Sequence, residues 1–390
     1  MRVASENRIP ELDGLRGLAV LMVLAWHFIG SPSGGTDYAK PFHYLTVFGR
    51  TGVDLFFVLS GFLITGILTD HRQSPHLLPA FYARRALRIY PPYIVLIALY
   101  WTVFYVMGPT TVANADVVPV WKQVLAQVTF TWNWLMAAYN GPIAQGFTVT
   151  WSVAIEEWFY LLLPAIVIFT PPRKLALTLF TIACCSVAAR VGLHLLYPSA
   201  KLAPYVLTPM RLDGLCFGGL VALVYRDADL MAELRARQDE LMRWALRLCL
   251  AIPVIIALIR GKSLYAHMNL WGHLYLSIAY SMLLMAVLVC KDVRQLRSGV
   301  LQWAGRYSYS LYLFHPLFLS LVFVLAERRR RFDEWVDVGL AAIALALTIA
   351  FCVALYHVLE RPLIDYGRAR FSYRNGWAGS RVRPIEADVK

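Results

Sequence analysis

Residues 16–27 read RGLAVLMVLAWH, an apolar run with a cation at one end and an imidazole at the other. Arg16 and His27 are eleven positions apart, and eleven steps of about 100° return an α-helix to within about 20° of its starting direction. Both side chains therefore share one helix face, roughly 16 Å apart along the axis. Ionisable groups inside a membrane span are costly and by default functional. The alternative is an arginine that reaches the helix end and a histidine bonded to a neighbouring helix.

Long apolar runs recur along the whole chain. Of its 390 residues, 59% are hydrophobic and 16% are charged, whereas about a quarter of the residues in a soluble protein are charged. The composition therefore predicts an all-α fold, a polytopic transmembrane helix bundle of about ten spans. The expected spans are residues 12–30, 52–69, 91–107, 151–170, 175–196, 208–225, 243–259, 271–290, 304–325 and 337–358.

The basic residues set the expected orientation. The net charge is +13, but most lysines and arginines lie in short loops between apolar runs. This pattern follows the positive-inside rule, places both termini in the cytoplasm and argues against nucleic-acid binding. The run ERRRR at Glu327–Arg331 falls outside in this topology. It is either solvated or in contact with an anionic acceptor or lipid headgroups.

Several connecting segments carry weaker signals. The outer loop 108–150 holds Trp121, Trp132, Trp134 and Tyr139, which favour an interfacial aromatic belt over sugar stacking. The segment that starts at Ala228 predicts one amphipathic cytoplasmic helix.

The two ends of the chain and its cysteines complete the outline. The chain after Pro362 is polar and basic, and we expect it to be flexible. The N-terminal apolar stretch lacks a signal-peptide cleavage site and is expected to be a retained span. The six cysteines have no metal-ligand spacing, and no metal site is expected.

The second span, GVDLFFVLSGFLITGIL, contains polar residues that need partners. Asp54 lies near its outer end, and Ser60 and Gly61 lie in its middle. An intramembrane carboxylate requires a partner, and Gly61 allows another backbone or a ligand to approach closely. A structural hydrogen bond between helices is the equally weighted alternative.

The segment FYARRALRIYPPY follows on the inner side. Arg84 and Arg88 are four apart and share a helix face, with Arg85 beside them. Paired guanidinium groups suit phosphate, although ordinary contact with inner-leaflet headgroups is the favoured interpretation of these residues taken alone. Pro91 and Pro92 are expected to break the helix before the third span.

The fourth span begins TWSVAIEEWFYLLLP. Ser152 and Glu156 can share a face, whereas adjacent Glu156 and Glu157 point about 100° apart. Arg211 lies at a similar depth in TPMRLDGLCFGGL, with Asp213 beside it, and could pair with one of the glutamates. The alternative role for these groups is a closed ion-pair network that holds spans together.

The ninth span contains GRYSYSLYLFHPL. Ser308, Tyr312 and His315 occupy one helix face, and Pro316 frees a backbone carbonyl and kinks the helix. The simpler interpretation of His315 is a buried core residue whose ring nitrogens are hydrogen-bonded within the bundle. Glu360 and Arg361 mark the inner end of the last span and are expected to be anchors or a structural pair.

No Walker loop, GxSxG elbow, HExxH, CxxC or GxGxxG motif occurs. Any chemistry must therefore use histidine, carboxylate and arginine side chains. Taken together and in order, IPELDGLRGLAVLMVLAWH, GVDLFFVLSGFLIT, FYARRALRIYPPY, TWSVAIEEWFYLLLP, RLDGL, YSYSLYLFHPL and LERP resemble the acyltransferase-3 family of integral membrane O-acyltransferases. The resemblance extends from about residue 8 to residue 366.

The resemblance implies transfer of an acyl group, most simply acetyl, from cytoplasmic acyl-CoA to a hydroxyl of a surface or lipid-linked glycan. It implies that His27 is the essential base and that Arg16 and the inner arginines serve CoA, with no tightly bound cofactor. The expected roles are catalytic for His27, Glu156 and Asp54; acyl-CoA binding for Arg16, Arg84, Arg85, Arg88 and Ser60; and acceptor binding for Arg211, Asp213, Tyr312, His315 and Trp151.

The expected organisation is an acyltransferase domain at 1–366 and a basic cytoplasmic tail at 367–390, in the inner (plasma) membrane. Longer relatives carry an appended SGNH-type domain, so this chain is expected to act alone or to pass its acyl group to a partner. Two other functions stay open: the same chemistry on a macrolide-like metabolite, and proton-coupled transport. Inverted repeats would favour the transporter, and none is evident.

Overall fold

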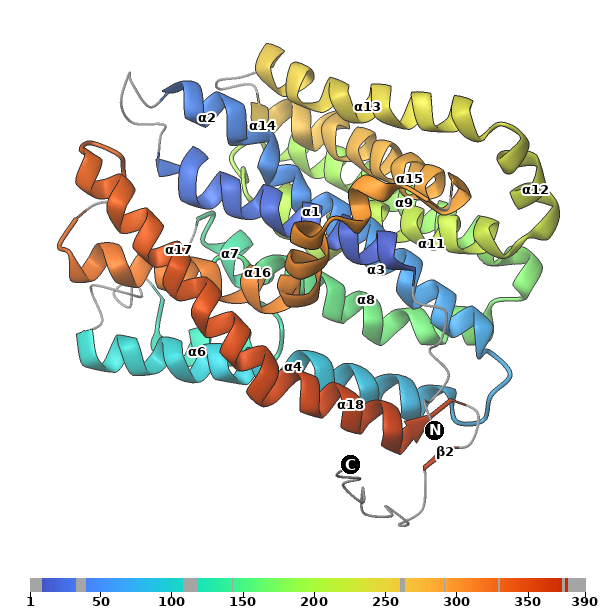
Figure 1. The fold of residues 1–390 in the computed structure, drawn as a ribbon, viewed down its shortest axis with the longest axis horizontal. Coiled ribbons are helices and arrows are strands. Elements are labelled where there is room, and N and C mark those ends of the chain that lie inside the picture. Colours follow the sequence, from blue (N-terminus) through green and yellow to red (C-terminus); the bar gives the residue numbers. More distant parts are fainter. Residues whose placement is uncertain are drawn as a thin grey trace, which may run out of the picture.

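The computed structural model describes residues 9–32, 40–107, 118–141, 143–259, 264–290, 292–328, 330–373 and 376–377. Within them the chain forms a helical bundle whose long helices run roughly across the view of Figure 1. The start of α1 and the turn at α12 lie at the right end, and α2 lies at the left end (Figure 1). The fold is the polytopic helix bundle that the composition predicts.

The first half of the bundle comprises α1 (Pro10–Ala25), η1 (Trp26–Gly30), α2 (Lys40–Thr46), η3 (Val47–Thr51), α3 (Gly52–Asp70), α4 (Leu77–Met107), α6 (Val120–Val128), α7 (Trp132–Ala138), η4 (Gln145–Phe147), α8 (Thr150–Phe169) and α9 (Pro172–Leu196). The second half comprises α10 (Ala203–Val206), η5 (Thr208–Met210), α11 (Leu212–Arg226), α12 (Ala228–Ala236), α13 (Gln238–Leu258), α14 (Leu264–His267), η6 (Met268–Gly272), α15 (His273–Cys290), η7 (Arg294–Arg297), α16 (Gly299–Leu325), α17 (Trp335–Leu355), η8 (Tyr356–Glu360), α18 (Arg361–Arg370), β1 (Phe371–Ser372) and β2 (Gly376–Trp377).

Nine helices in the described part of the chain are long and apolar enough to cross a membrane. They correspond to all the expected spans except 208–225, where the 15-residue α11 follows the short turn η5. Helix α11 packs against α3, α9 and α15 inside the bundle. The chain is therefore a multi-pass membrane protein, with a short tenth helix enclosed by the others.

Close backbone contact positions the helices at the centre. A Cβ on Gly61 would lie 1.9 Å from the Leu215 carbonyl oxygen, and one on Gly218 would lie 2.0 Å from that of Val58. Helices α3 and α11 therefore touch backbone to backbone, as the sequence predicted for Gly61. Small residues allow this approach in membranes, where packing rather than hydrophobic burial joins helices.

Three π-helical turns interrupt the bundle at polar residues. The turn η1 contains His27, η6 immediately precedes His273, and η8 ends at Glu360. A π-turn inserts one residue into the helical register, and such insertions are frequent at functional sites. Because η1 begins at Trp26, the α-helical register between Arg16 and Ala25 is intact.

The predicted helix break at Pro91 and Pro92 is wrong. Helix α4 runs without interruption through both prolines. Two consecutive prolines leave the carbonyls of Leu87 and Arg88 without their helical N–H donors. Neighbouring side chains can compensate such positions in membrane helices. Next to the freed carbonyls, the Tyr309 hydroxyl donates to the Ile89 carbonyl at 3.0 Å.

The predictions for two segments expected on the cytoplasmic side are also corrected. The single amphipathic helix expected from Ala228 is two helices, α12 and α13, which meet at Arg237. The segment after Pro362, expected to be flexible, continues as α18 and a short antiparallel pair with Phe371 opposite Trp377. The carbonyl of Phe371 accepts a hydrogen bond from Arg84, which ties the pair to α4. Of the tail, residues 374–375 and 378–390 lie outside the described residues.

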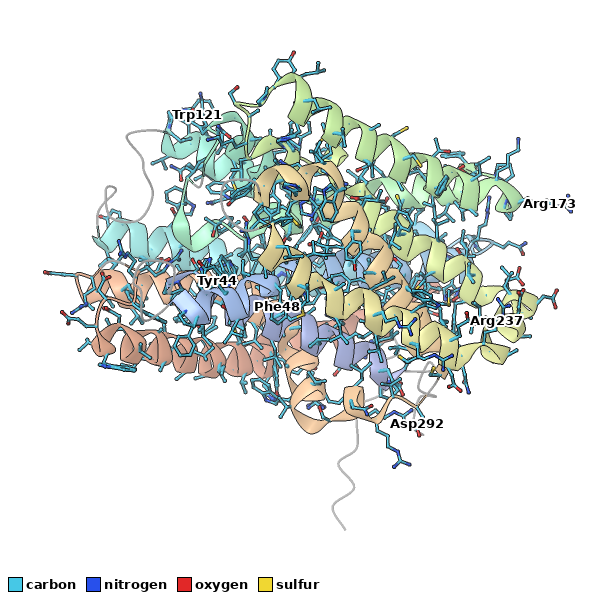
Figure 2. All side chains as sticks on the ribbon, turned by 90° about the horizontal axis from the view of Figure 1, so that it is seen from above. Tyr44, Phe48, Trp121, Arg173, Arg237 and Asp292 are labelled. Carbon is cyan, nitrogen blue, oxygen red and sulfur yellow. The ribbon has the colours of Figure 1, made fainter. Side chains whose placement is uncertain are left out.

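The loop expected at 108–150 contains the helices α6 and α7, and residues 108–117 and 142 lie outside the described part. Trp132 is fully buried and packs on Phe147, so it belongs to the core and not to an aromatic belt. Trp121 is 63% exposed. In Figure 2 Trp121 lies in the left half of the bundle, whereas Arg173 and Arg237 lie at the right end.

Candidate active site

The imidazole of His27 is fixed within the bundle by a backbone carbonyl. Its Nδ1 donates to the Val23 carbonyl oxygen at 2.9 Å. In the neutral ring this leaves the lone pair on Nε2, free to accept a proton. The ring packs edge-on against His315 of α16, with 4.6 Å between ring centroids. The Val23 carbonyl therefore orients the His27 ring.

His315 repeats the same arrangement on the facing helix. The residue is fully buried, and its Nδ1 lies 3.1 Å from the Leu311 carbonyl oxygen. The ring also interacts with the Tyr312 carbonyl, which Pro316 leaves without its helical donor. Nε2 has no hydrogen-bond partner among the residues that the structure describes. The proline–histidine pair in the sequence thus fixes the ring orientation.

A hydroxyl pair lies beside the two imidazoles. The Tyr312 and Ser152 hydroxyl oxygens are 2.5 Å apart, and the Tyr312 ring centroid is 6.0 Å from that of His315. Ser152 faces Tyr312, whereas Glu156, one turn farther along α8, accepts a hydrogen bond from Tyr160 at 2.7 Å. The predicted shared face of Ser152 and Glu156 therefore presents two different environments.

A cavity of about 400 Å³ opens at the end of the bundle where α1 begins. Its charged lining comprises five arginines and three carboxylates: Arg16, Arg88, Arg306, Arg361, Arg368, Asp13, Glu360 and Asp365. Glu360 accepts a hydrogen bond from Ser310, and Arg361 lies 3.8 Å from Asp365. Glu360 and Arg361 are therefore not paired with each other, and Glu360 belongs to the cavity.

Besides the exposed Arg306, which has no ion-pair partner in the described residues, Arg16 and Arg88 are the unneutralised cations of this cavity. Within the described residues no carboxylate oxygen lies within 4 Å of either guanidinium group. The two groups repel each other electrostatically. Glu156 interacts with both only at longer range. Two arginines held together without a bound acid form a site for an anion.

The structure separates the three inner arginines of α4. Arg84 donates from Nε to the Phe371 carbonyl at 2.6 Å and stacks on Tyr373, away from the cavity. Arg85 lies over the Tyr160 ring, 5.5 Å from its centroid. Of these three arginines of α4, Arg88 is the one that lines the cavity with Arg16.

A polar chain connects this arginine group to the middle of the bundle. Ser60 of α3 hydrogen-bonds the Tyr160 hydroxyl, which in turn donates to Glu156. Glu156 also interacts electrostatically with Arg16. Ser60, Tyr160 and Glu156 therefore lie near the Arg16 end of α1.

Asp54 and Arg211 form a buried ion pair that sequence analysis did not assign. Nη2 of Arg211 lies 2.7 Å from Oδ1 of Asp54, and Nδ1 of His273 lies 3.2 Å from the same oxygen. Asp213 is held by Arg190 of α9, with Nη1–Oδ1 and Nη2–Oδ2 distances of 3.1 and 2.9 Å. These contacts join α3, α9, α11 and α15.

His273 and Arg190 were missed in the sequence. Arg190 is a lone cation within the predicted span 175–196, and an intramembrane charge is itself a signal. His273 carried a weaker signal, at the start of the predicted span 271–290. Trp151 packs on Tyr205, with 4.7 Å between ring centroids, and so lies beside this network.

The amino-acid sequence of this chain is similar to those of known acyltransferases. The model of the acyltransferase domain family matches residues 9–357. The O-acetyltransferase OatA of Staphylococcus aureus strain NCTC 8325 is 25% identical over 404 aligned residues, which cover 98% of this chain and 62% of that protein. OatA of strain MRSA252 is 25% identical over 392 residues, which cover 95% of this chain and 60% of its own length.

This chain thus spans less than two thirds of the length of these relatives. No solved structure matches it. The family match extends from the first residue of the described bundle into η8, and covers His27, the buried ion pairs and the part of the arginine cavity that Arg16, Arg88 and Arg306 line. The chain therefore belongs to the acyltransferase-3 family.

Proposed function

We propose that this chain is an integral membrane O-acetyltransferase that transfers an acetyl group from cytoplasmic acetyl-CoA to a hydroxyl of a carbohydrate, with His27 as the general base. The single observation that carries the proposal is the orientation of His27. Its Nδ1 is committed to the Val23 carbonyl, and its ring lies inside the bundle against His315. A neutral imidazole with a free Nε2 is suited to take a proton from a hydroxyl near neutral pH.

The arginine cavity supports CoA as the carrier of the acetyl group. Arg16 and Arg88 present guanidinium groups with no acid within 4 Å in the described residues. Such planar donors match the oxygens of a diphosphate. The cavity volume of about 400 Å³ falls within the range of small-molecule sites. Following the positive-inside rule, we propose that this end of the bundle faces the cytoplasm, with the protein in the plasma membrane.

The distance between the two sites supports delivery of a thioester along α1. Arg16 and His27 are separated by about 16 Å of helix rise. A pantetheine arm has the length and flexibility to cover this distance when its phosphates rest on Arg16 and Arg88. The chain Ser60–Tyr160–Glu156 lies near the Arg16 end and supplies polar partners for the arm.

The transfer step is written as direct attack. Nε2 of His27 removes the proton from the acceptor hydroxyl while the hydroxyl oxygen attacks the thioester carbonyl carbon. The C–S bond then breaks, and the CoA sulfur leaves and recovers the proton from the imidazolium. The products are the acetyl ester and CoA–SH, with no net change at His27. Ring contact with His315 holds the base in place during both proton transfers.

The remaining predicted site residues divide into two roles. His315 packs against the base and Tyr312 lies beside His315, whereas Trp151 packs on Tyr205; all three are proposed to contact the acceptor. Asp54, Arg211 and Asp213 are held in ion pairs and are proposed to keep helices in register rather than to react. We propose no catalytic role for Asp54.

The test is His27→Ala in purified protein reconstituted in nanodiscs, with radiolabelled acetyl-CoA and a cell-surface glycan acceptor. Loss of the general base is expected to reduce transfer by about 10³-fold, while the thermal unfolding temperature stays within the range of the unmodified protein. His194→Ala, which changes a histidine in the last turn of α9, serves as the matched control. Near-normal acetylation by His27→Ala would end the proposed mechanism. A parallel assay in proteoliposomes separates the enzyme from a transporter, because an enzyme leaves the label on the acceptor and a transporter moves solute into the vesicle lumen.

A further inference from the structure

Arg50 lies at the outer end of α3, beside the proposed base. Its guanidinium carbon is 5.3 Å from the ring centroid of Trp26, the residue that precedes His27, and 5.3 Å from that of Tyr265. Nη2 of Arg50 lies 3.4 Å from the Tyr265 hydroxyl oxygen. Arg50 also interacts electrostatically with His27. Among the described residues, the groups in contact with this cation, Trp26 and Tyr265, are neutral.

Arg330 approaches the same imidazole from the loop between α16 and α17. The backbone N–H of Phe332 donates to the Pro32 carbonyl at 3.2 Å, which fixes this loop against the end of η1. Arg330 interacts electrostatically with both His27 and His315. Burial lowers the pKa of the Arg330 guanidinium, as expected for a cation that has lost water without gaining an acid.

The other described arginines of this loop are neutralised. Arg328 lies 2.6 Å from Asp337 and 3.1 Å from Glu334, and Arg331 lies 3.4 Å from Asp333. By contrast, no carboxylate within the described residues lies within 4 Å of Arg330 or Arg50. Arg329 lies outside the described residues. The described part of the basic run thus divides into paired cations, Arg328 and Arg331, and Arg330, which has no carboxylate within 4 Å and interacts electrostatically with the base.

A partly buried cation without a carboxylate partner carries an uncompensated desolvation penalty, which a bound anion offsets. A cavity of about 30 Å³ extends from Arg50 between Tyr205, Tyr265 and His273. This volume admits a water-sized group and excludes a sugar ring. A sugar-borne anion that binds Arg50 must therefore lie outside this cavity.

On the basis of the function proposed above, we propose that the acceptor is an anionic carbohydrate, whose carboxylate or phosphate is bound by Arg50 and Arg330 so that a neighbouring hydroxyl faces His27. Charge complementarity carries the inference. Two guanidinium groups from separate elements can both contact one anion through their planar forks. The same contact fixes which hydroxyl of the sugar reaches Nε2 of His27.

The experiment compares acceptors that differ only in charge. Purified protein in nanodiscs receives saturating acetyl-CoA and either methyl β-glucuronide, glucose 1-phosphate or methyl β-glucoside, and mass spectrometry quantifies the acetylated sugar. Arg50→Gln and Arg330→Gln remove each cation while keeping a polar side chain that can form hydrogen bonds. Arg331→Gln is the matched control, because it removes a neutralised charge from the same loop. Hydrolysis of acetyl-CoA without a sugar reports on the catalytic machinery alone.

We expect the unmodified protein to favour a charged acceptor, and the carboxylate and phosphate arms to identify the anion. Each of Arg50→Gln and Arg330→Gln should raise KM for that acceptor about 10- to 100-fold, the loss typical of one charge-assisted hydrogen bond. For Arg50→Gln and Arg330→Gln, KM for methyl β-glucoside and the rate of acetyl-CoA hydrolysis should change less than about twofold. For Arg331→Gln, every KM and the hydrolysis rate should change less than about twofold, because an exposed ion pair contributes little.

Three results would overturn the inference. One is a neutral acceptor that is used as well as the charged ones. Another is an equal fall in kcat for charged and neutral sugars, which would mean that the arginines stabilise the transition state. The third is no transfer to either charged sugar; if acetyl-CoA is still hydrolysed in a His27-dependent manner, the proposed function survives this failure, and if it is not, both proposals fall.

Discussion

Two sets of arginines inside this bundle have opposite electrostatic surroundings. Arg211 and Arg190 are buried and lie 2.7 and 2.9 Å from the carboxylates of Asp54 and Asp213. Arg16 and Arg88 face a cavity of about 400 Å³ and have no acid within 4 Å in the described residues. A neutralised buried cation holds helices together, whereas an unneutralised one is a binding site that its ligand completes. Whether a buried arginine has a carboxylate partner therefore distinguishes a structural residue from a binding residue. The presence of a charge in a span does not.

The largest expected effect tests the neutralised pair. Arg211→Ala leaves the Asp54 carboxylate buried with only His273 as a partner, and should lower the free energy of unfolding by about 3–5 kcal/mol. Thermal unfolding in detergent, followed by tryptophan fluorescence, measures this loss. Asp54→Asn combined with Arg211→Gln should recover part of the stability, because no unpaired charge remains. Unchanged stability with lost transfer would instead place Arg211 in the acceptor site.

The next effect tests the unneutralised pair. Arg88→Gln should raise KM for acetyl-CoA about 10- to 100-fold, the cost of one charge-assisted hydrogen bond, with little change in kcat. The unfolding temperature should not fall, since the substitution also removes repulsion between Arg88 and Arg16. Initial rates against acetyl-CoA concentration give the result. An unaltered KM would show that Arg88 serves only membrane topology.

A smaller effect is expected at the contact between the two imidazoles. His315→Phe keeps an aromatic ring against His27 but removes both nitrogen atoms. We expect kcat to fall about tenfold, which corresponds to one lost polar interaction in the transition state, and KM for acetyl-CoA to stay unchanged. Saturation kinetics separate the two parameters. A rate equal to that of the unmodified protein would restrict His315 to packing.

The smallest effect sharpens the division among the inner arginines. Arg84 hydrogen-bonds the Phe371 carbonyl and lies outside the cavity. Arg84→Ala should therefore lower stability by about 1 kcal/mol, the value of a typical hydrogen bond, and leave KM for acetyl-CoA unchanged. The matched comparison with Arg88→Gln uses the same assay. A large increase in KM for Arg84→Ala would return this residue to the CoA site.

Much of the bundle could be predicted from local pattern. Apolar runs identify the spans because a chain in lipid must satisfy its backbone hydrogen bonds within helices. Gly61 predicted a close helix contact, because a residue without a side chain lets a neighbouring backbone approach. The predictions failed where tertiary contacts override local preference, as at Pro91 and Pro92 within α4. They also failed at Trp132, which is buried although its segment was expected to be a surface loop.

The sequence by itself determined the membrane character of the chain, predicted one shared helix face for Arg16 and His27, and indicated the local geometry that Pro316 gives to His315. These follow from helix periodicity and from the chemistry of single residues, which need no knowledge of neighbouring helices. Only the tertiary structure decided that Arg211 pairs with Asp54, that Arg84 leaves the cavity and that Arg330 approaches His27. The physical reason is that electrostatic partners are chosen by distance in space, and helices far apart in sequence set that distance.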